Sequence, residues 1–286
     1  MTHRSAAAIL ITAISLALPA LSLAGTLDQI KKSGEIRIGY RTDAPPLAFN
    51  DSAGQPAGYS VDLCKRIATA VKDDLKLADL KVTFVPLTSA DRIDAVVNNK
   101  ADIECGATTV TLSREEKVDF TLMTFVTGGS LLSLGESAVN ALSDTAGKSI
   151  AVVKGTTSET ALKNALTKNL IDAKVTTVAS REEGMKQLDA KQVAAFASDQ
   201  VVLIGQIIQS ADPKKYALAR ELFSYEPYAF VVRRNDSAFL LVANRALAQT
   251  YRTGQIEQVY GKWFGQAGIK PSPVLAAMYA LQSLPE

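Results

Sequence analysis

Two periods alternate in the pattern of apolar and polar residues along the chain. Segments with apolar residues at every second position predict strands, and segments with apolar residues every three or four positions predict the helices between them. The predicted strands are 35–40, 81–85, 149–153, 174–178, 193–197 and 216–219. The predicted helices are 26–32, 60–71, 89–98, 156–166, 180–190, 200–209, 236–252 and 255–264. This order is typical of an α/β protein with parallel sheets, built here from two βαβ units.

Two long extended runs, 120–127 and 224–232, separate these units. If both cross from one unit to the other, the second domain is inserted in the first, and the two runs make a two-strand hinge over a cleft. We therefore predict one lobe from residues 25–126 plus 229–286 and a second, inserted lobe from residues 127–228.

Polar side chains at four predicted helix starts are expected to act as N-caps. Ser60 and Ser89 precede apolar helical patterns, and Thr156 and Ser180 each have a glutamate three residues later, as in a capping box. We predict that each of these hydroxyls accepts a backbone N–H of its helix.

The segment 102–120 passes from an apolar strand into a hydroxyl-rich turn and then into a helix start. Thr109 supplies a hydroxyl, and Ser113 with Glu116 fits a capping box, which places Arg114 in the first helical turn. Backbone N–H groups, the positive helix end and a guanidinium would then converge on one anion. The alternative is an ordinary capped helix with Arg114 in solvent.

Other candidate residues also follow predicted strands or begin predicted helices. They are Arg41, Ser89, Arg92 and Asp199. Because ligands of open α/β sheets bind at the carboxyl ends of the strands, these side chains are expected to line one cleft with Thr109 and Arg114.

The first 24 residues are typical of a secretory signal peptide. Arg4 is followed by an apolar run from 6 to 18, and Ala24 ends a stretch of small residues suited to cleavage. An uncleaved anchor is the alternative, but a run of about 13 residues is short for a span that needs about 20.

Composition narrows the function classes. The chain is 47% apolar and 21% charged, with 31 Lys and Arg against 29 Asp and Glu, so it is globular and close to neutral. The chain has no block of basic residues of the kind that binds nucleic acid. The single histidine, His3, leaves with the signal peptide, and two cysteines are too few for a zinc site. We therefore predict a small-molecule partner and no metal or cofactor.

The two cysteines, Cys64 and Cys105, can form a disulfide if the chain is exported to an oxidising compartment. The bridge would close a loop of about 40 residues and stabilise the fold by about 2–4 kcal/mol. Two buried free thiols are the alternative.

With these residues in view, the chain resembles the periplasmic solute-binding proteins of ABC importers for polar amino acids, and among them the glutamate/aspartate-binding group. The resemblance runs from about Thr26 to Gly265. It rests on six segments in order, namely Gly58–Asp62, Thr88–Arg92, Asp102–Thr109, Arg114 with Val118–Phe120, Lys154–Glu159 and Lys262–Gly265. It implies a two-lobed periplasmic-binding-protein fold.

The resemblance also implies ligand contacts. The arginine at Arg114 would hold the α-carboxylate, helped by Thr109 and by the second-lobe turn at Thr156 and Thr157, and Asp199 would receive the α-ammonium. A zwitterion needs such a cation and a separate anion.

Arg41, Ser89 and Arg92 would surround an acidic side chain of the ligand. Two departures from the group are visible. Ala107 stands where the relatives have a serine, and the segment 180–183 stands at the helix start where they place a histidine near the ligand, with Arg181 as a cation that could substitute for it. Glu183 is expected to belong to the capping box and not to the ligand site.

The resemblance implies a periplasmic binding protein that captures glutamate or aspartate and delivers it to an ABC permease, and not an enzyme. We expect a monomer by default. One alternative is an enzyme on the same scaffold, similar to the cyclohexadienyl or arogenate dehydratases, for which Glu104 or Glu183 would be the general acid. The other is a sensory module that reports amino acids to a receptor.

Overall fold

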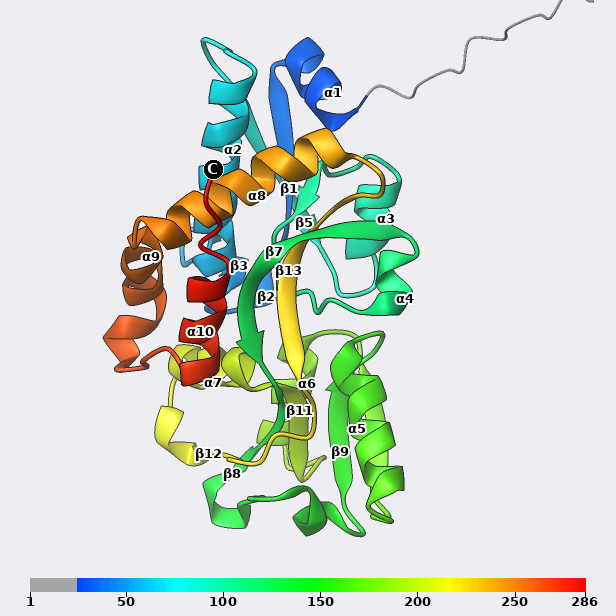
Figure 1. Ribbon diagram of the computed structural model, residues 1–286. Helices are drawn as coiled ribbons and strands as arrows, with labels where there is room; N and C mark the ends of the chain where they lie inside the picture. The colour runs from blue at the N-terminus through cyan, green and yellow to red at the C-terminus, as the bar shows by residue number, and fades with distance from the viewer. Residues whose placement is uncertain (1–24) are drawn as a thin grey trace, which may run out of the picture.

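The computed structural model describes residues 25–286, so the predicted signal peptide of residues 1–24 lies outside the described residues. Figure 1 shows two lobes joined by two long neighbouring strands, β7 (Val118–Thr127) and β13 (Glu226–Arg233). Each lobe contains a sheet with helices on its faces. The predicted α/β class and the insertion of the second lobe in the first are confirmed.

The first lobe contains a five-stranded sheet in the order β5-β1-β6-β13-β7. Its other strands are β1 (Glu35–Arg41), β5 (Lys81–Leu87) and β6 (Ile103–Glu104). β1 pairs in parallel with β5 and β6, while β13 is antiparallel to β6 and β7. The helices of this lobe are α1 (Thr26–Ser33), α2 (Tyr59–Asp74), α3 (Arg92–Val97), α4 (Leu112–Glu115), α8 (Ser237–Arg252), α9 (Gln255–Phe264) and α10 (Pro273–Leu281), with the 3-10 helix η4 (Gly265–Ala267).

The second lobe contains a five-stranded sheet in the order β10-β9-β11-β8-β12. Its strands are β8 (Gly129–Leu134), β9 (Ser149–Val153), β10 (Lys174–Val178), β11 (Ala195–Asp199) and β12 (Tyr216–Leu218). Its helices are α5 (Thr157–Lys168), α6 (Arg181–Asp189) and α7 (Gln200–Gln209), with the 3-10 helices η1 (Gly135–Ser137), η2 (Leu142–Thr145) and η3 (Pro213–Lys215). The pattern had not indicated β8, which follows directly on β7.

The Pro-rich turn after β1 forms a small third sheet. Its strands are β2 (Asp43–Ala44), β3 (Ala48–Asn50) and β4 (Pro56–Ala57), all antiparallel. We propose that the lobes meet at 126/127 and 228/229, because β7 and β13 pair with each other up to Thr127 and Glu226 and the second sheet starts at Gly129.

Two predicted N-caps have the expected hydrogen bonds. Thr156 Oγ1 accepts the backbone N–H of Glu159, and Ser180 Oγ accepts that of Glu183. Each glutamate carboxylate returns to a backbone N–H just before the helix, at Gly155 and at Ala179. Glu183 therefore caps its helix, as expected.

Three predicted caps are wrong, because another residue takes the position. Helix α2 begins after Gly58, whose φ of 129° favours glycine, and Ser60 Oγ instead donates to Gly106 O at 3.0 Å. Asp91 precedes α3, so Ser89 is not its cap. Thr111, and not Ser113, accepts the N–H of Arg114, so α4 begins two residues earlier than predicted and is a single turn.

The C-terminal tail packs on the first lobe. Helix α10 buries Leu275, Met278 and Tyr279, and its Tyr279 hydroxyl meets that of Tyr59 at 2.8 Å. Gln282, just after α10, binds both the N–H and the C=O of Met123 on β7. In Figure 1 α10 lies beside β7, the last strand of its sheet.

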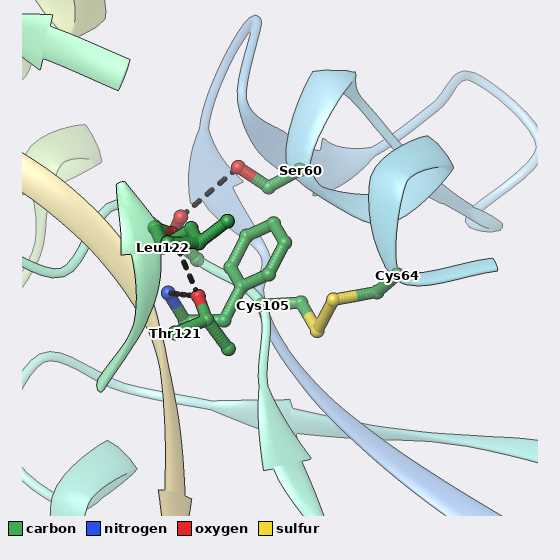
Figure 2. Close-up of a disulfide and its surroundings, with 7 residues drawn as sticks. Ser60, Cys64, Cys105, Thr121 and Leu122 are labelled. Atoms are coloured by element: carbon green, nitrogen blue, oxygen red, sulfur yellow. Dashed lines mark hydrogen bonds between the residues drawn. A yellow bond between two sulfur atoms is a disulfide. The ribbon is translucent and has the colours of Figure 1, made fainter. Parts of the chain in front are cut away.

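Cys64 and Cys105 form a disulfide between α2 and the segment that follows β6. Figure 2 shows the bridge with Ser60 one helical turn before Cys64. Both cysteines are fully buried. Because Cys105 leads into the segment 107–109, the bridge and the Ser60 hydrogen bond fix the start of the candidate binding segment against α2.

The lobes pack closely at the Pro-rich turn. Val201 and Val202 of α7 belong to the same apolar core as Ala44 and Leu47 of the first lobe. A Cβ on Gly205, also in α7, would lie 2.1 Å from the carbonyl oxygen of Pro45. The approach of the lobes therefore requires glycine at this position.

We expect Gly205→Ala to favour the open arrangement of the lobes, because the added methyl group collides with backbone of the opposite lobe. Ligand affinity should fall by about tenfold or more, whereas thermal unfolding of the ligand-free lobes should change little, since alanine suits a helix. Isothermal titration calorimetry measures the first and calorimetric unfolding the second. Gly261→Ala, which meets nothing within 4 Å among the described residues, is the control; unchanged affinity in Gly205→Ala would contradict the expectation.

Candidate functional site

The candidate residues of the first lobe gather at the carboxyl ends of its strands. Arg41 ends β1, Ser89 follows β5, and Ala107 and Thr109 follow β6. The backbone on either side of Thr109 pairs with β13, since Val110 N–H donates to Pro227 O and Ala229 N–H donates to Thr108 O. This pairing holds the hydroxyl-rich turn against the hinge, where it faces the second lobe.

Arg41 and Arg92 are almost fully buried, each with 2% of its surface exposed. Burial, followed by the charge of Arg181, lowers the pKa of Arg41 to about 9. Burial and the charge of Arg114 lower the pKa of Arg92 to about 10. Both guanidiniums therefore remain charged at neutral pH, in a place where positive charge is costly.

Several buried donors of this cluster have no hydrogen-bond partner within residues 25–286. They are Arg41 Nε and Nη1, Ser89 Oγ, Arg92 Nε and Arg181 Nε. A buried donor without a partner costs about 1–3 kcal/mol, and more when it is charged. The arrangement is therefore suited to an anion that accepts these hydrogen bonds.

Arg114 lies next to Thr109. Its Nη1 donates to Thr109 O at 2.6 Å, and its backbone N–H is held by Thr111, which fixes the one-turn helix α4. Burial lowers the pKa of Arg114, while the charges of Glu104 and Glu226 oppose that shift. Ala107, the position without a hydroxyl, offers its carbonyl to Arg92 Nη1 at 3.4 Å.

Both threonines of the second lobe line the groove between the lobes, and of the two Thr157 directs its hydroxyl to the first lobe. Thr157 Oγ1 lies 3.1 Å from Thr109 Oγ1 of the first lobe and donates to Glu226 at 2.7 Å. Thr156 instead donates to Val153 O and accepts the N–H of Glu159. Its hydroxyl is therefore occupied by the cap of α5.

Asp199 is buried at the end of β11. It accepts hydrogen bonds from Ser158 Oγ at 2.8 Å and from the hydroxyl of Tyr228, which lies on β13. Glu226 stands near it and accepts from three hydroxyls, those of Thr109, Thr157 and Ser224. Burial, followed by the charge of Asp199, raises the pKa of Glu226.

Glu226 was not among the predicted site residues, because the segment 224–232 has the pattern of an apolar crossover. A single carboxylate inside an apolar extended run is itself a signal, since a buried charge requires partners. The site therefore has two ends. We call the end with Asp199 and Glu226 the anionic end, and the end with Arg41, Arg92 and Arg181 the cationic end.

Glu104 is fully buried beneath the arginines, and neither of its oxygens has a hydrogen-bond partner among the described residues. Burial raises its pKa, although the charges of Arg92, Arg41 and Arg114 oppose the shift. Because it lies close to these arginines, Glu104 is placed to act as their counter-ion.

Asp43 was also missed. Its Oδ1 lies 2.6 Å from Arg41 Nη2 and 3.2 Å from Arg181 Nη1. Arg181, the residue at the predicted departure, is 2% exposed and reaches across from α6 to the first lobe. Asp43 lies in the Pro-rich turn, where the sequence indicated only loop chemistry.

A groove of about 550 Å³ opens beside the anionic end. Residues of both lobes line it, among them Thr111, Arg114, Thr157, Asn164 and Glu226. It gives the site access to solvent at the end that holds Arg114.

No helix within residues 25–286 is long and apolar enough to cross a membrane.

Two lobes with a groove between them, and with polar groups from both at their junction, define a ligand-binding protein of the periplasmic-binding-protein class. Residues 36–266 match the model of the bacterial extracellular solute-binding proteins, family 3. The chain belongs to this family.

Curated relatives with high similarity are transport proteins. The chain is 35% identical over 91% of its length to the L-glutamate/L-aspartate-binding protein of Pseudomonas aeruginosa, 86% of which is covered. It is 31% identical over 84% of its length to the glutamate/aspartate import solute-binding protein of Salmonella typhimurium, 79% of which is covered. These similarities agree with a binding protein rather than an enzyme.

A solved structure of similar shape is the ancestral amino acid-binding protein AncCDT-1, a precursor of cyclohexadienyl dehydratase. Its TM-score is 0.72 at 30% identity, with 84% of this chain and 99% of that chain covered. Because AncCDT-1 is itself an amino acid-binding protein, this likeness also agrees with binding.

We expect Arg114→Ala to weaken ligand binding by about 2–5 kcal/mol, because a desolvated ligand anion would lose its charge-assisted partner. Arg114→Lys should recover part of this loss, since it restores the charge but not the planar fork. Calorimetric titration gives the affinities, and Arg220→Ala, at an exposed position of the second lobe, is the control. An Arg114→Ala affinity within threefold of wild type would falsify this role.

The raised pKa of Glu226 gives a pH dependence with a defined sign. Because the folded state holds this proton at a pH where the unfolded chain, with its ordinary pKa near 4.5, has lost it, stability should fall as pH rises above that value. Glu226→Gln should remove this part of the slope. Urea unfolding of ligand-free protein between about pH 4 and about pH 7 measures it. The control is Glu182→Gln, at an exposed carboxylate; equal slopes for wild type and Glu226→Gln would contradict the assignment.

Proposed function

We propose that this protein captures an acidic L-amino acid, glutamate or aspartate, between its two lobes and delivers it to the membrane subunits of an ABC permease. The observation that supports this most directly is the set of buried donors on Arg41, Ser89 and Arg92 without partners among the described residues. These are the residues expected to surround the side-chain carboxylate of the ligand.

The charge balance of the cleft supports an anionic ligand. Four guanidiniums interact there, those of Arg41, Arg92, Arg114 and Arg181. Four carboxylates accompany them, those of Asp43, Glu104, Asp199 and Glu226, and burial raises the pKa of Glu104 and Glu226, which opposes the ionised forms of these two. An acidic amino acid brings further negative charge to the buried guanidiniums, whereas a basic one would add positive charge next to them.

The other end of the cleft suits the α-ammonium and α-carboxylate. Asp199, with Glu226 near it, offers negative charge to the ammonium. Arg114, Thr109 and Thr157 lie beside them and can hold the carboxylate. Separated partners for the two charges of the zwitterion, and a third site for the side chain, make three points of recognition.

Binding is the mechanism, and no bond is made or broken. The ligand contacts both lobes, so it shifts the equilibrium between open and closed arrangements by its higher affinity for the closed one. The names of the two curated relatives support glutamate and aspartate as ligands.

The dehydratase alternative has less support. Of its two candidate acids, Glu183 caps α6 and Glu104 lies beneath three arginines. We further propose that the protein acts as a monomer in the periplasm after cleavage of the predicted signal peptide, in keeping with its family of extracellular solute-binding proteins. A sensory role would use the same site and the same closure.

Thermal unfolding of the mature protein, refolded to remove bound ligand, tests the proposal. L-glutamate, L-aspartate, glutamine, asparagine, arginine and histidine are each added in excess. Ligand at about 100 times its Kd adds about 2.7 kcal/mol to stability. We expect a shift with the two acidic amino acids only; a shift with arginine or the amides would show that the cationic end does not select a carboxylate, and no shift would lead to an assay with arogenate and prephenate.

A further inference from the structure

One carboxylate of the first lobe binds arginines of both lobes. Asp43 Oδ1 lies 2.6 Å from Nη2 of Arg41, on its own lobe, and 3.2 Å from Nη1 of Arg181, on α6 of the second lobe. The side chains of both arginines are buried, with exposures of 2% and 3%, whereas that of Asp43 is 22% exposed. The carboxylate therefore lies at the edge of the cleft, between two cations that closure brings together.

Further contacts fix Asp43 to the second lobe. Its Oδ2 accepts the backbone N–H of Arg181 at 3.4 Å, and its backbone oxygen accepts Gln206 Nε2 at 3.1 Å. The first contact places a negative charge at the positive end of α6, a helix whose cap Ser180 belongs to the same lobe. Asp43 thus contacts α6 and α7 from across the cleft.

The two arginines would repel each other without this carboxylate. After burial, the charge of Arg181 has the largest effect on Arg41, and it lowers the pKa of that guanidinium. Burial alone would raise the pKa of Asp43, but the charges of Arg181 and Arg41 lower it overall, so the carboxylate is ionised at neutral pH. Closure therefore places one negative charge between two positive ones.

Asp43 does not use the donors that face the ligand. It occupies Nη2 of Arg41 and leaves Nε and Nη1 of that residue without a partner among residues 25–286. It therefore reduces the positive charge of the cationic end without filling the place of the ligand. Its charge opposes that of an acidic ligand, and its contacts favour the closed lobes.

We propose that Asp43 is a positioning and specificity-determining residue, a counter-ion that joins the lobes through Arg181 and sets how strongly the arginines prefer an anionic side chain. The preference for an anionic side chain rests on the proposed function. The joining of the lobes does not, because it requires no ligand.

The joining of the lobes is tested in ligand-free protein by pulsed electron spin resonance. One spin label is placed on each lobe, at the exposed positions of Asp73→Cys and Lys168→Cys. We expect Asp43→Asn and Arg181→Gln each to lower the ratio of closed to open molecules by at least about threefold, and the double variant to lower it no further. Unchanged distances in both single variants, effects that multiply in the double variant, or a wild type without a closed fraction would overturn the proposal.

The selectivity is tested by calorimetric titration of L-glutamate and L-glutamine. Loss of lobe contacts in Asp43→Asn should weaken both ligands alike, while loss of its charge should favour glutamate. We therefore expect the ratio of the glutamine Kd to the glutamate Kd to rise by at least about threefold. The control is Asp79→Asn, at an exposed turn. An unchanged or lower ratio would overturn the role in specificity.

The two tests separate this proposal from the proposed function. If wild-type protein binds neither L-glutamate nor L-aspartate, the proposed function fails, and the spin-label distances still decide whether Asp43 joins the lobes. If wild type binds glutamate but the ratio and the distances in Asp43→Asn match those of wild type, the proposed function stands and the role of Asp43 fails.

Discussion

A buried guanidinium is stable only beside an anion, and this constraint governs the cleft between the two lobes. Arg41 and Arg92 are 2% exposed, and both have lowered pKa values because water no longer solvates their charge. Burial also raises the pKa of Glu104, which opposes the ionised form of the carboxylate beneath them. An anionic ligand, as in the proposed function, would supply these guanidiniums with the partner that they lack within residues 25–286.

The same constraint connects charge to motion. The strands β7 and β13 join the two lobes, and the charge of Arg181 of the second lobe acts on Arg41 of the first. If the lobes close as proposed, negative charge must accompany this approach, from Asp43 at the edge and from the proposed ligand inside. At the anionic end the lobes meet through short hydrogen bonds. Their donors are the uncharged hydroxyls of Thr109 and Thr157, and their acceptor is Glu226. In the proposed function, binding and closure are therefore coupled, because the ligand stabilises the arrangement in which the lobes meet.

Much of the fold could be predicted from local pattern, because a buried strand or helix face leaves a period in the sequence. Strands such as β10 and helices such as α7 and α9 match their predicted bounds. A glutamate three residues on marked the caps at Thr156 and Ser180 correctly, but the same spacing at Ser113 was misleading, because Thr111 takes that cap. Caps were not predictable where a neighbour takes the role, as Gly58 does before Ser60. Asp43 and Glu226 were missed for another reason: Arg181 and Thr109 contact them from more than 100 residues away, so the local pattern does not show which residues they bind.

The outer edge of β7 has a consequence for how molecules of this protein meet one another. As the last strand of its sheet, β7 would present free backbone groups to any other strand, a common origin of aggregation. Side-chain amides occupy that edge instead: Asn244 of α8 accepts the N–H of Leu122, and Gln282 binds both backbone groups of Met123. Helix α8 and the residue that follows α10 thus protect this edge of the sheet against strand pairing between chains.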